Sequence, residues 1–242
     1  MNILLSHYLT RCLLLTASYA ILGIWMMMYF APDGGASIVW PCSGLALGAL
    51  LLGGARYWPG VFAGEFLANL IMTDEWGLSS ALGAGNAIGA LCGFYAARFT
   101  PENGIFSLEH PREFWLLLLA AIVAATTAGL AGHLALWVFG PQPDDWITSL
   151  SLWIQGDVIG ILVLTPLMLA YGNAPRPKLN HQQKGECLAI IFATAFFAWG
   201  ILPASADNAL TAPYESVVFV LVVWAALRYG LLGALLLICL TV

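Results

Sequence analysis

Eight basic residues separate the apolar segments of this chain in a regular alternation. Every second gap between apolar runs contains Lys or Arg: Arg11, Arg56, Arg98 with Arg112, Arg176 with Lys178 and Lys184, and Arg228. The intervening gaps contain acids: Asp33, Asp74 with Glu75, Asp144 with Asp145, and Asp207 with Glu215. Lys and Arg gather in the cytoplasmic loops of polytopic membrane proteins. The pattern therefore predicts a membrane-spanning chain whose N-terminus lies in the cytoplasm.

The composition is that of a protein whose partner is the lipid bilayer. Apolar residues make up 61% of the chain and charged residues only 9%, which excludes an ordinary soluble domain. The net charge of -5 offers no basic face for nucleic acid. The first apolar run, residues 12–30, is longer than the apolar region of a typical secretory signal, so we expect it to be a retained first helix.

The spacing of the gaps predicts an all-α polytopic transmembrane helical bundle of eight or nine segments, in one domain that spans residues 1–242. The segments lie near residues 12–30, 38–53, 57–72, 78–97, 113–139, 151–171, 186–202, 214–227 and 229–242. A straight crossing needs about 20 residues. The second, third and eighth segments are shorter than this, so we expect short hairpins around Arg56 and Arg228.

The sequence indicates no catalytic residue, metal site or cofactor. The five cysteines form no C-x-x-C pair, and the four histidines have no metal-ligand spacing. No nucleophile has a base at a recognisable spacing, and no glycine loop of the phosphate-binding kind occurs. Glycines four residues apart predict close helix packing, either within one subunit or in a homodimer.

Glu65 is the only acid in the interior of an apolar run. A carboxyl group at this depth costs at least about 2.5 kcal/mol on insertion scales, unless it is protonated, paired or in contact with water. Asn69 follows one helical turn later, on the same helix face. Ligand binding or signal coupling, a structural hydrogen bond and proton transport all remain open for this pair.

Two further polar clusters open the second and sixth segments. Trp40 and Ser43 begin the second segment, where Ser43 can also serve as a helix N-cap after a proline. Gln155 and Asp157 lie in the first turns of the sixth, where the helix dipole alone favours an acid. We predict that Glu65, Asn69, Gln155 and Asp157 line one cavity open to the outside, with Trp40 and Ser43 at its mouth. Asn86 and His133 are interpreted as packing residues.

Several runs of the sequence also carry a family resemblance: 39–47 (VWPCSGLAL), 52–64 (LGGARYWPGVFAG), 153–160 (WIQGDVIG) with Pro166, and 224–230 (WAALRYG). In this order they resemble motifs of the membrane-associated sensor domain of the first MASE class. The resemblance implies a non-enzymatic, multi-pass sensory module of the bacterial inner membrane. Such modules are normally fused to a cytoplasmic histidine kinase of a two-component system, a diguanylate cyclase or a cyclic di-GMP phosphodiesterase.

The resemblance implies that the chain ends before its last crossing and its output domain. A small-molecule ligand or a partner membrane protein would then supply the signal. The alternative interpretation is a substrate-binding membrane subunit of a small-molecule transporter, which would share a compact bundle and an outward-facing cavity. A signalling domain after Val242 would favour the sensor.

Overall fold

The chain is α-helical throughout the part that its computed structural model describes. This part comprises residues 2–30, 39–98, 111–173 and 181–195, together with Leu221, Ala225, Gly233 and Leu237. The helices are α1 (Asn2–Phe30), α2 (Pro41–Gly53), the 3-10 helix η1 (Ala55–Tyr57), α3 (Trp58–Thr73), α4 (Trp76–Ala97), α5 (Pro111–Phe139), α6 (Trp146–Asn173) and α7 (His181–Ala195). The predicted all-α class is confirmed for these residues.

The helices follow the predicted segments closely. The first six segments overlap α1 to α6, although α1 begins at Asn2 instead of near residue 12 and α6 at Trp146 instead of near residue 151, and the seventh segment overlaps α7. Three described helices are long and apolar enough to cross a membrane: His7–Tyr29 in α1, Arg112–Phe139 in α5 and Trp146–Gly172 in α6. Apart from Leu221, Ala225, Gly233 and Leu237, the eighth and ninth segments lie outside the described residues. The total number of crossings therefore stays a prediction.

The helix ends have local causes in the sequence. Proline lies in the first turn of α2 and of α3, where the missing N–H is not needed. Gly54 ends α2 with a φ of 93°, a conformation that glycine adopts without strain. Asp145 caps α6, because its carboxylate accepts hydrogen bonds from the Ile147 and Thr148 amides at 3.1 and 3.2 Å. The Thr148 hydroxyl adds a bond that, with the amides, lowers the pKa of Asp145.

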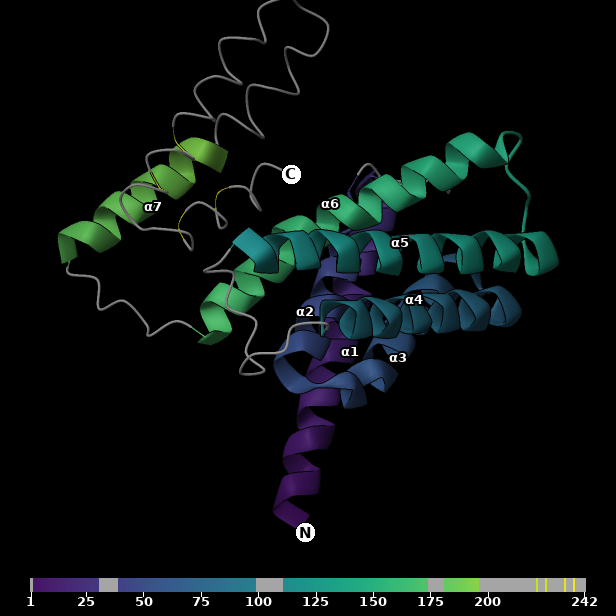
Figure 1. Ribbon diagram of the computed structural model, residues 1–242, viewed down its shortest axis with the longest axis horizontal. Coiled ribbons are helices and arrows are strands. Elements are labelled where there is room, and N and C mark those ends of the chain that lie inside the picture. The colour runs from purple at the N-terminus through teal and green to yellow at the C-terminus, as the bar shows by residue number, and fades with distance from the viewer. Residues whose placement is uncertain are drawn as a thin grey trace, which may run out of the picture. The chain divides into compact units, whose positions relative to one another are not determined.

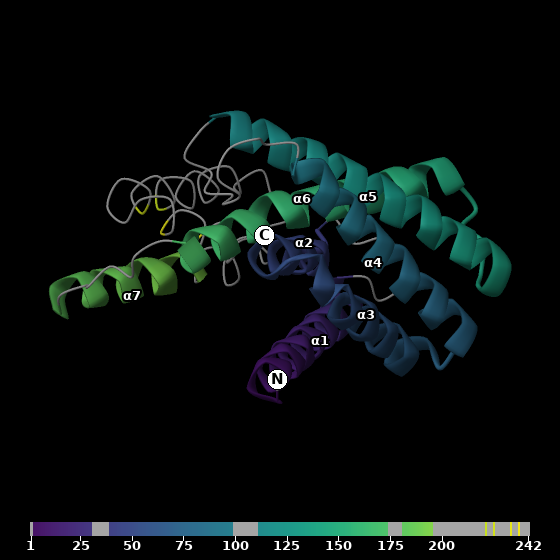
Figure 2. The same cartoon turned by 60° about the horizontal axis from the view of Figure 1, so that its bottom comes forward.

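Two compact units divide the chain, Met1–Leu169 and Ala170–Val242. In the first unit α4 and α5 lie side by side, and α3 packs against α1 and α4 (Figures 1 and 2). Small residues allow this proximity: a Cβ atom added to Gly89 or Gly93 of α4 would lie within 3 Å of α5 atoms. The glycine face of α4 is thus used within one chain. In the second unit, Ile190 of α7 belongs to a small core with Ala225 and Leu237.

The backbones of α2 and α6 lie in direct contact. The Trp40 amide donates a hydrogen bond to the Gly156 carbonyl oxygen at 2.9 Å, and the Thr165 hydroxyl donates to the Gly44 carbonyl oxygen at 2.9 Å. A Cβ atom at Gly44 would overlap with the Gly160 carbonyl oxygen. Only glycine permits such an approach, and it brings the polar residues of α2 and α6 into the core.

Candidate functional site

Glu65 lies in the core of the first unit and binds the amides of two asparagines. Its side chain is 3% exposed. The Oε1 atom accepts hydrogen bonds from Asn69 Nδ2 at 2.9 Å and from Asn86 Nδ2 at 3.1 Å. Asn69 is on the same helix, α3, whereas Asn86 belongs to α4. The Glu65 carboxyl group therefore connects two helices through a buried polar bond.

Asp157 makes the second polar connection, between α6 and α2. Its side chain is fully buried, and its Oδ1 atom accepts a hydrogen bond from the Ser43 hydroxyl at 2.6 Å. Bonds of this length are typical of a hydroxyl that donates to a carboxylate. Ser43 and Asp157 are 114 residues apart in the chain, and the close approach of α2 and α6 brings them together.

Tyr19 adds a third buried polar group, from α1. Its ring and hydroxyl are inaccessible to solvent. The hydroxyl lies close enough to the carboxyl groups of Glu65 and Asp157 to interact electrostatically with both. The hydroxyl is also close enough to the Glu65 carboxyl group to act as its hydrogen-bond donor, whereas Asp157 Oδ2 has no hydrogen-bond partner among the described residues. We call Tyr19, Ser43, Glu65, Asn69, Asn86 and Asp157 the buried polar cluster.

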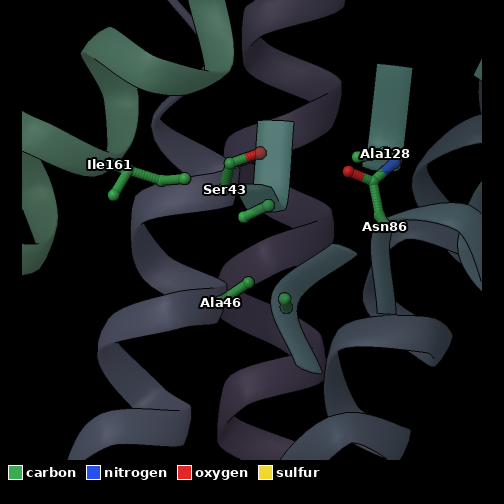
Figure 3. Close-up of a pocket in the computed structure, with 7 residues that line it drawn as sticks. Ser43, Ala46, Asn86, Ala128 and Ile161 are labelled. Atoms are coloured by element: carbon green, nitrogen blue, oxygen red, sulfur yellow. The ribbon is translucent and has the colours of Figure 1, made fainter. Parts of the chain in front are cut away.

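A small cavity lies beside this cluster. It has a volume of about 10 Å³, enough for about one water molecule. Two polar residues line it, Ser43 and Asn86, and each is the hydrogen-bond partner of one carboxyl group. Figure 3 shows these two side chains extending toward each other from α2 and α4. The other lining residues are apolar: Ala46, Ala90, Ala124, Ala128 and Ile161. A cavity of this volume admits a water molecule but no organic ligand.

The comparisons with known proteins give one family. The family model for MASE1 matches residues 9–242, essentially the whole chain. The chain belongs to the MASE1 family. MASE1 is a family of membrane sensory domains, so the resemblance inferred from the four runs of sequence is confirmed. Neither the curated proteins nor the solved structures include a match to this MASE1 chain.

Four of the six predicted site residues of this MASE1 domain lie in the buried polar cluster: Ser43, Glu65, Asn69 and Asp157. Trp40 contributes through its backbone amide, which binds α6. Gln155 is exposed on α6 and is not part of the cluster. Among the six, only Ser43 lines the cavity. A role of these residues in ligand binding or signal coupling stays a prediction.

Two members of the cluster are not among the predicted site residues. Tyr19 is an aromatic residue in an apolar run, so nothing in the sequence distinguishes it from a membrane-facing side chain. From the sequence, Asn86 is interpreted as a packing residue. A lone amide in an apolar run could have indicated the site, because a buried amide needs a hydrogen-bond partner. His133 fits that interpretation, since its ring nitrogens contact the Gly129 carbonyl oxygen at 2.9 Å and the Ser149 hydroxyl at 3.2 Å.

Proposed function

We propose that this MASE1 chain is the multi-pass sensory input module of a bacterial inner-membrane sensor. In this proposal it receives a signal from the outer side or from the bilayer and transmits it to a cytoplasmic output domain. A histidine kinase, a diguanylate cyclase or a cyclic di-GMP phosphodiesterase is the class of output that suits such a module. The observation that carries the proposal is the pair of buried carboxyl groups, Glu65 and Asp157, each bonded to a neighbouring helix.

These bonds support signal coupling because they join four helices in two pairs, with a fifth helix beside them. Asp157 connects α6 to α2, Glu65 connects α3 to α4, and the Tyr19 hydroxyl of α1 lies near both carboxyl groups. A buried polar group that loses its partner costs about 1–3 kcal/mol. A change of charge or of ligand at the cluster therefore favours a different arrangement of the helices around it. Such a two-state element is what coupling between distant sites requires.

The ends of the helices support the proposed topology with a cytoplasmic N-terminus. Near the start of α1, the Tyr8 hydroxyl donates a hydrogen bond to the Arg56 carbonyl oxygen at 2.9 Å, which brings the basic turn after α2 to the N-terminal end. Two acidic turns, at residues 74–75 and 144–145, follow or precede segments that approach each other, because a Cβ atom at Gly140 would lie 3.4 Å from the Leu78 side chain. These two contacts group one basic turn with the N-terminal end of α1 and two acidic turns with each other, which supports the proposal that successive turns alternate between the two sides of the membrane.

Fusions to a phosphatase that is active only in the periplasm test this topology. We expect activity when the enzyme follows Asp144 and none when it follows Lys184, because α6 lies between the two junctions and crosses the membrane. Colony colour and enzyme assays, normalised to the amount of fusion protein, give the result. Equal activity at the two junctions would mean that α6 does not span, and the proposed topology would then be wrong.

Glu65→Gln tests the signalling role. The chain, joined to a diguanylate cyclase domain through that enzyme's own linker, should set the cellular level of cyclic di-GMP. We expect Glu65→Gln to accumulate as the wild type does, because glutamine keeps the size and the hydrogen-bonding oxygen of glutamate. It should nevertheless change the cyclic di-GMP level several-fold, because the charge of the cluster has changed.

Glu75→Gln is the matched control, since it makes the same change at an exposed acid in the turn before α4. It should leave the cyclic di-GMP level unchanged. If Glu65→Gln also behaved like the wild type while being present at equal amounts, Glu65 would have only a structural role, and the proposal would lose the observation that carries it. Asp157→Asn provides an independent second variant.

A further inference from the structure

The two buried carboxyl groups have separate hydrogen-bond partners, and both partners line the same small cavity. Ser43 of α2 binds Asp157 at 2.6 Å, and Asn86 of α4 binds Glu65 at 3.1 Å. Ser43 and Asn86 are also the polar residues that line the cavity, whose volume of about 10 Å³ suits one water molecule. A molecule in this cavity is therefore in contact with both carboxyl pairs.

The two polar side chains offer only hydrogen-bond acceptors to the cavity. The amide nitrogen of Asn86 has two N–H groups, and it donates to Glu65 Oε1 at 3.1 Å and to the Leu82 carbonyl oxygen at 3.3 Å. Figure 3 shows the oxygen of this amide on the side of Ser43 and the nitrogen on the far side. The Ser43 hydroxyl has a single proton and donates it to Asp157, so the lone pairs of its oxygen remain. The occupant that fits must therefore donate two hydrogen bonds.

We propose that this cavity binds one water molecule, which donates one hydrogen bond to Ser43 Oγ and the other to Asn86 Oδ1. Water has two hydrogens for the two acceptors, and a buried water needs about 2–4 polar partners. An ammonium ion would bring four N–H donors to the same two acceptors, because the rest of the lining is apolar. Its remaining donors would be buried without a partner, which is unfavourable. The chemistry of the lining therefore selects water.

The water joins the two carboxyl pairs into one hydrogen-bonded network. This network runs from Asp157 in α6 to Ser43 in α2, through the water to Asn86 in α4, and on to Glu65 in α3. The Tyr19 hydroxyl of α1 extends it, since it is placed to donate to the Glu65 carboxyl group. A bridging water is nearly as favourable as a direct hydrogen bond, so a change at one carboxyl group can reach the other. The role of the water in signalling rests on the proposed function, whereas its presence can be tested without an output domain.

A crystal structure of the purified chain, at a resolution that shows ordered waters, tests the site directly. The crystals are grown without ammonium salts. We expect one density peak in the cavity, at about 2.7–3.0 Å from Ser43 Oγ and from Asn86 Oδ1. In Asn86→Leu, which replaces the amide by an apolar side chain of similar size, this peak should be absent. A wild-type cavity without density, or a peak that contacts neither oxygen, would overturn the proposal.

A double-mutant cycle tests the connection between the two carboxyl pairs. Ser43→Ala and Asn86→Leu each remove one acceptor of the water, so either substitution should displace it. Each single variant then includes the loss of the water, whereas the double variant includes this loss only once. We expect the fall in Tm of the double variant to be smaller than the sum of the two single falls by about 2–4 °C. Thermal unfolding in detergent, followed by tryptophan fluorescence, measures these values.

Thr127→Ala combined with Ser43→Ala is the control cycle. The Thr127 hydroxyl donates to the Val123 carbonyl oxygen of its own helix at 2.7 Å, and Thr127 does not line the cavity, so these two falls in Tm should add. If the falls for Ser43→Ala and Asn86→Leu add as well, the two carboxyl pairs are independent and the network is wrong. If Asn86→Leu does not fold, the wild-type density decides. None of these measurements uses signalling output, so the water site and the proposed function can fail independently.

Discussion

Gly160→Ala should destabilise the protein strongly, because it adds a methyl group where two backbones touch. A Cβ atom at Gly160 would overlap with the Trp40 carbonyl oxygen and lie 2.5 Å from the Trp40 carbonyl carbon. The Trp40 amide is itself bonded to the Gly156 carbonyl oxygen at 2.9 Å, so the segment cannot turn aside. Overpacking of a rigid core costs about 1–3 kcal/mol and occasionally more. We expect a loss of about 3 kcal/mol or more, measured as a lower Tm and as less folded protein in the membrane fraction.

Gly185→Ala is the matched control for this substitution. Gly185 lies in α7, and a Cβ atom there would have nothing within 4 Å. Alanine favours a helix over glycine by about 1 kcal/mol, so this variant should be as stable as the wild type or slightly more stable. If Gly160→Ala also unfolded at the wild-type temperature, the backbone contact between α2 and α6 would be wrong.

Ser43→Ala should have the second largest effect, because it removes the donor that binds the buried carboxyl group of Asp157 at 2.6 Å. The Asp157 Oδ2 atom already has no partner among the described residues, so both oxygens would then be unsatisfied. Hydrogen bonds to charged groups contribute about 1.5–3 kcal/mol, and we expect a loss of free energy of unfolding in this range. Denaturation in detergent, followed by tryptophan fluorescence, measures it.

A double-mutant cycle with Asp157→Asn separates this pair from other effects of the Ser43 change. In the Asp157→Asn background, Ser43→Ala should lower the free energy of unfolding by less than it does in the wild type. We expect a difference of at least about 1 kcal/mol, because no buried carboxyl group is left unpaired. Ser80→Ala is the control, since Ser80 is exposed and its hydroxyl bonds to its own helix, at Trp76. Equal costs of Ser43→Ala in both backgrounds would show that the hydroxyl and the carboxyl group do not interact.

The helices could be predicted from the sequence because their ends have local signals. Pro41, Pro59 and the acidic residues of the turns mark these ends, and α2 to α5 begin and end within three residues of the prediction, whereas α1 begins at Asn2 instead of near residue 12. The partners of the polar residues could not be predicted in this way. Ser43 and Asp157 meet because two glycines let α2 approach α6, and no local pattern encodes which helices meet.

Gln155 shows how helix geometry limits the predicted site. The sequence prediction places it in the same cavity as Asp157, two residues later. Two residues advance an α-helix by about 200°, so neighbours at this spacing point in nearly opposite directions. The structure buries Asp157 and leaves Gln155 exposed, as this geometry requires. Helix geometry does not help in the same way with Tyr19. A tyrosine among apolar residues does not indicate whether its hydroxyl faces the core or the membrane interface.

The bond from Thr165 to Gly44 has a mechanical consequence for α6. Pro166 follows directly, and a proline inside a helix lacks the amide that would bind the carbonyl oxygen four residues earlier. Thr165 therefore binds α6 to α2 through its hydroxyl. The next residue, Pro166, makes no backbone hydrogen bond to the preceding turn of α6. Bending of α6 costs least at this point. The helix continues to Asn173, so a bend at residues 165–166 would change the direction of the last two turns of α6.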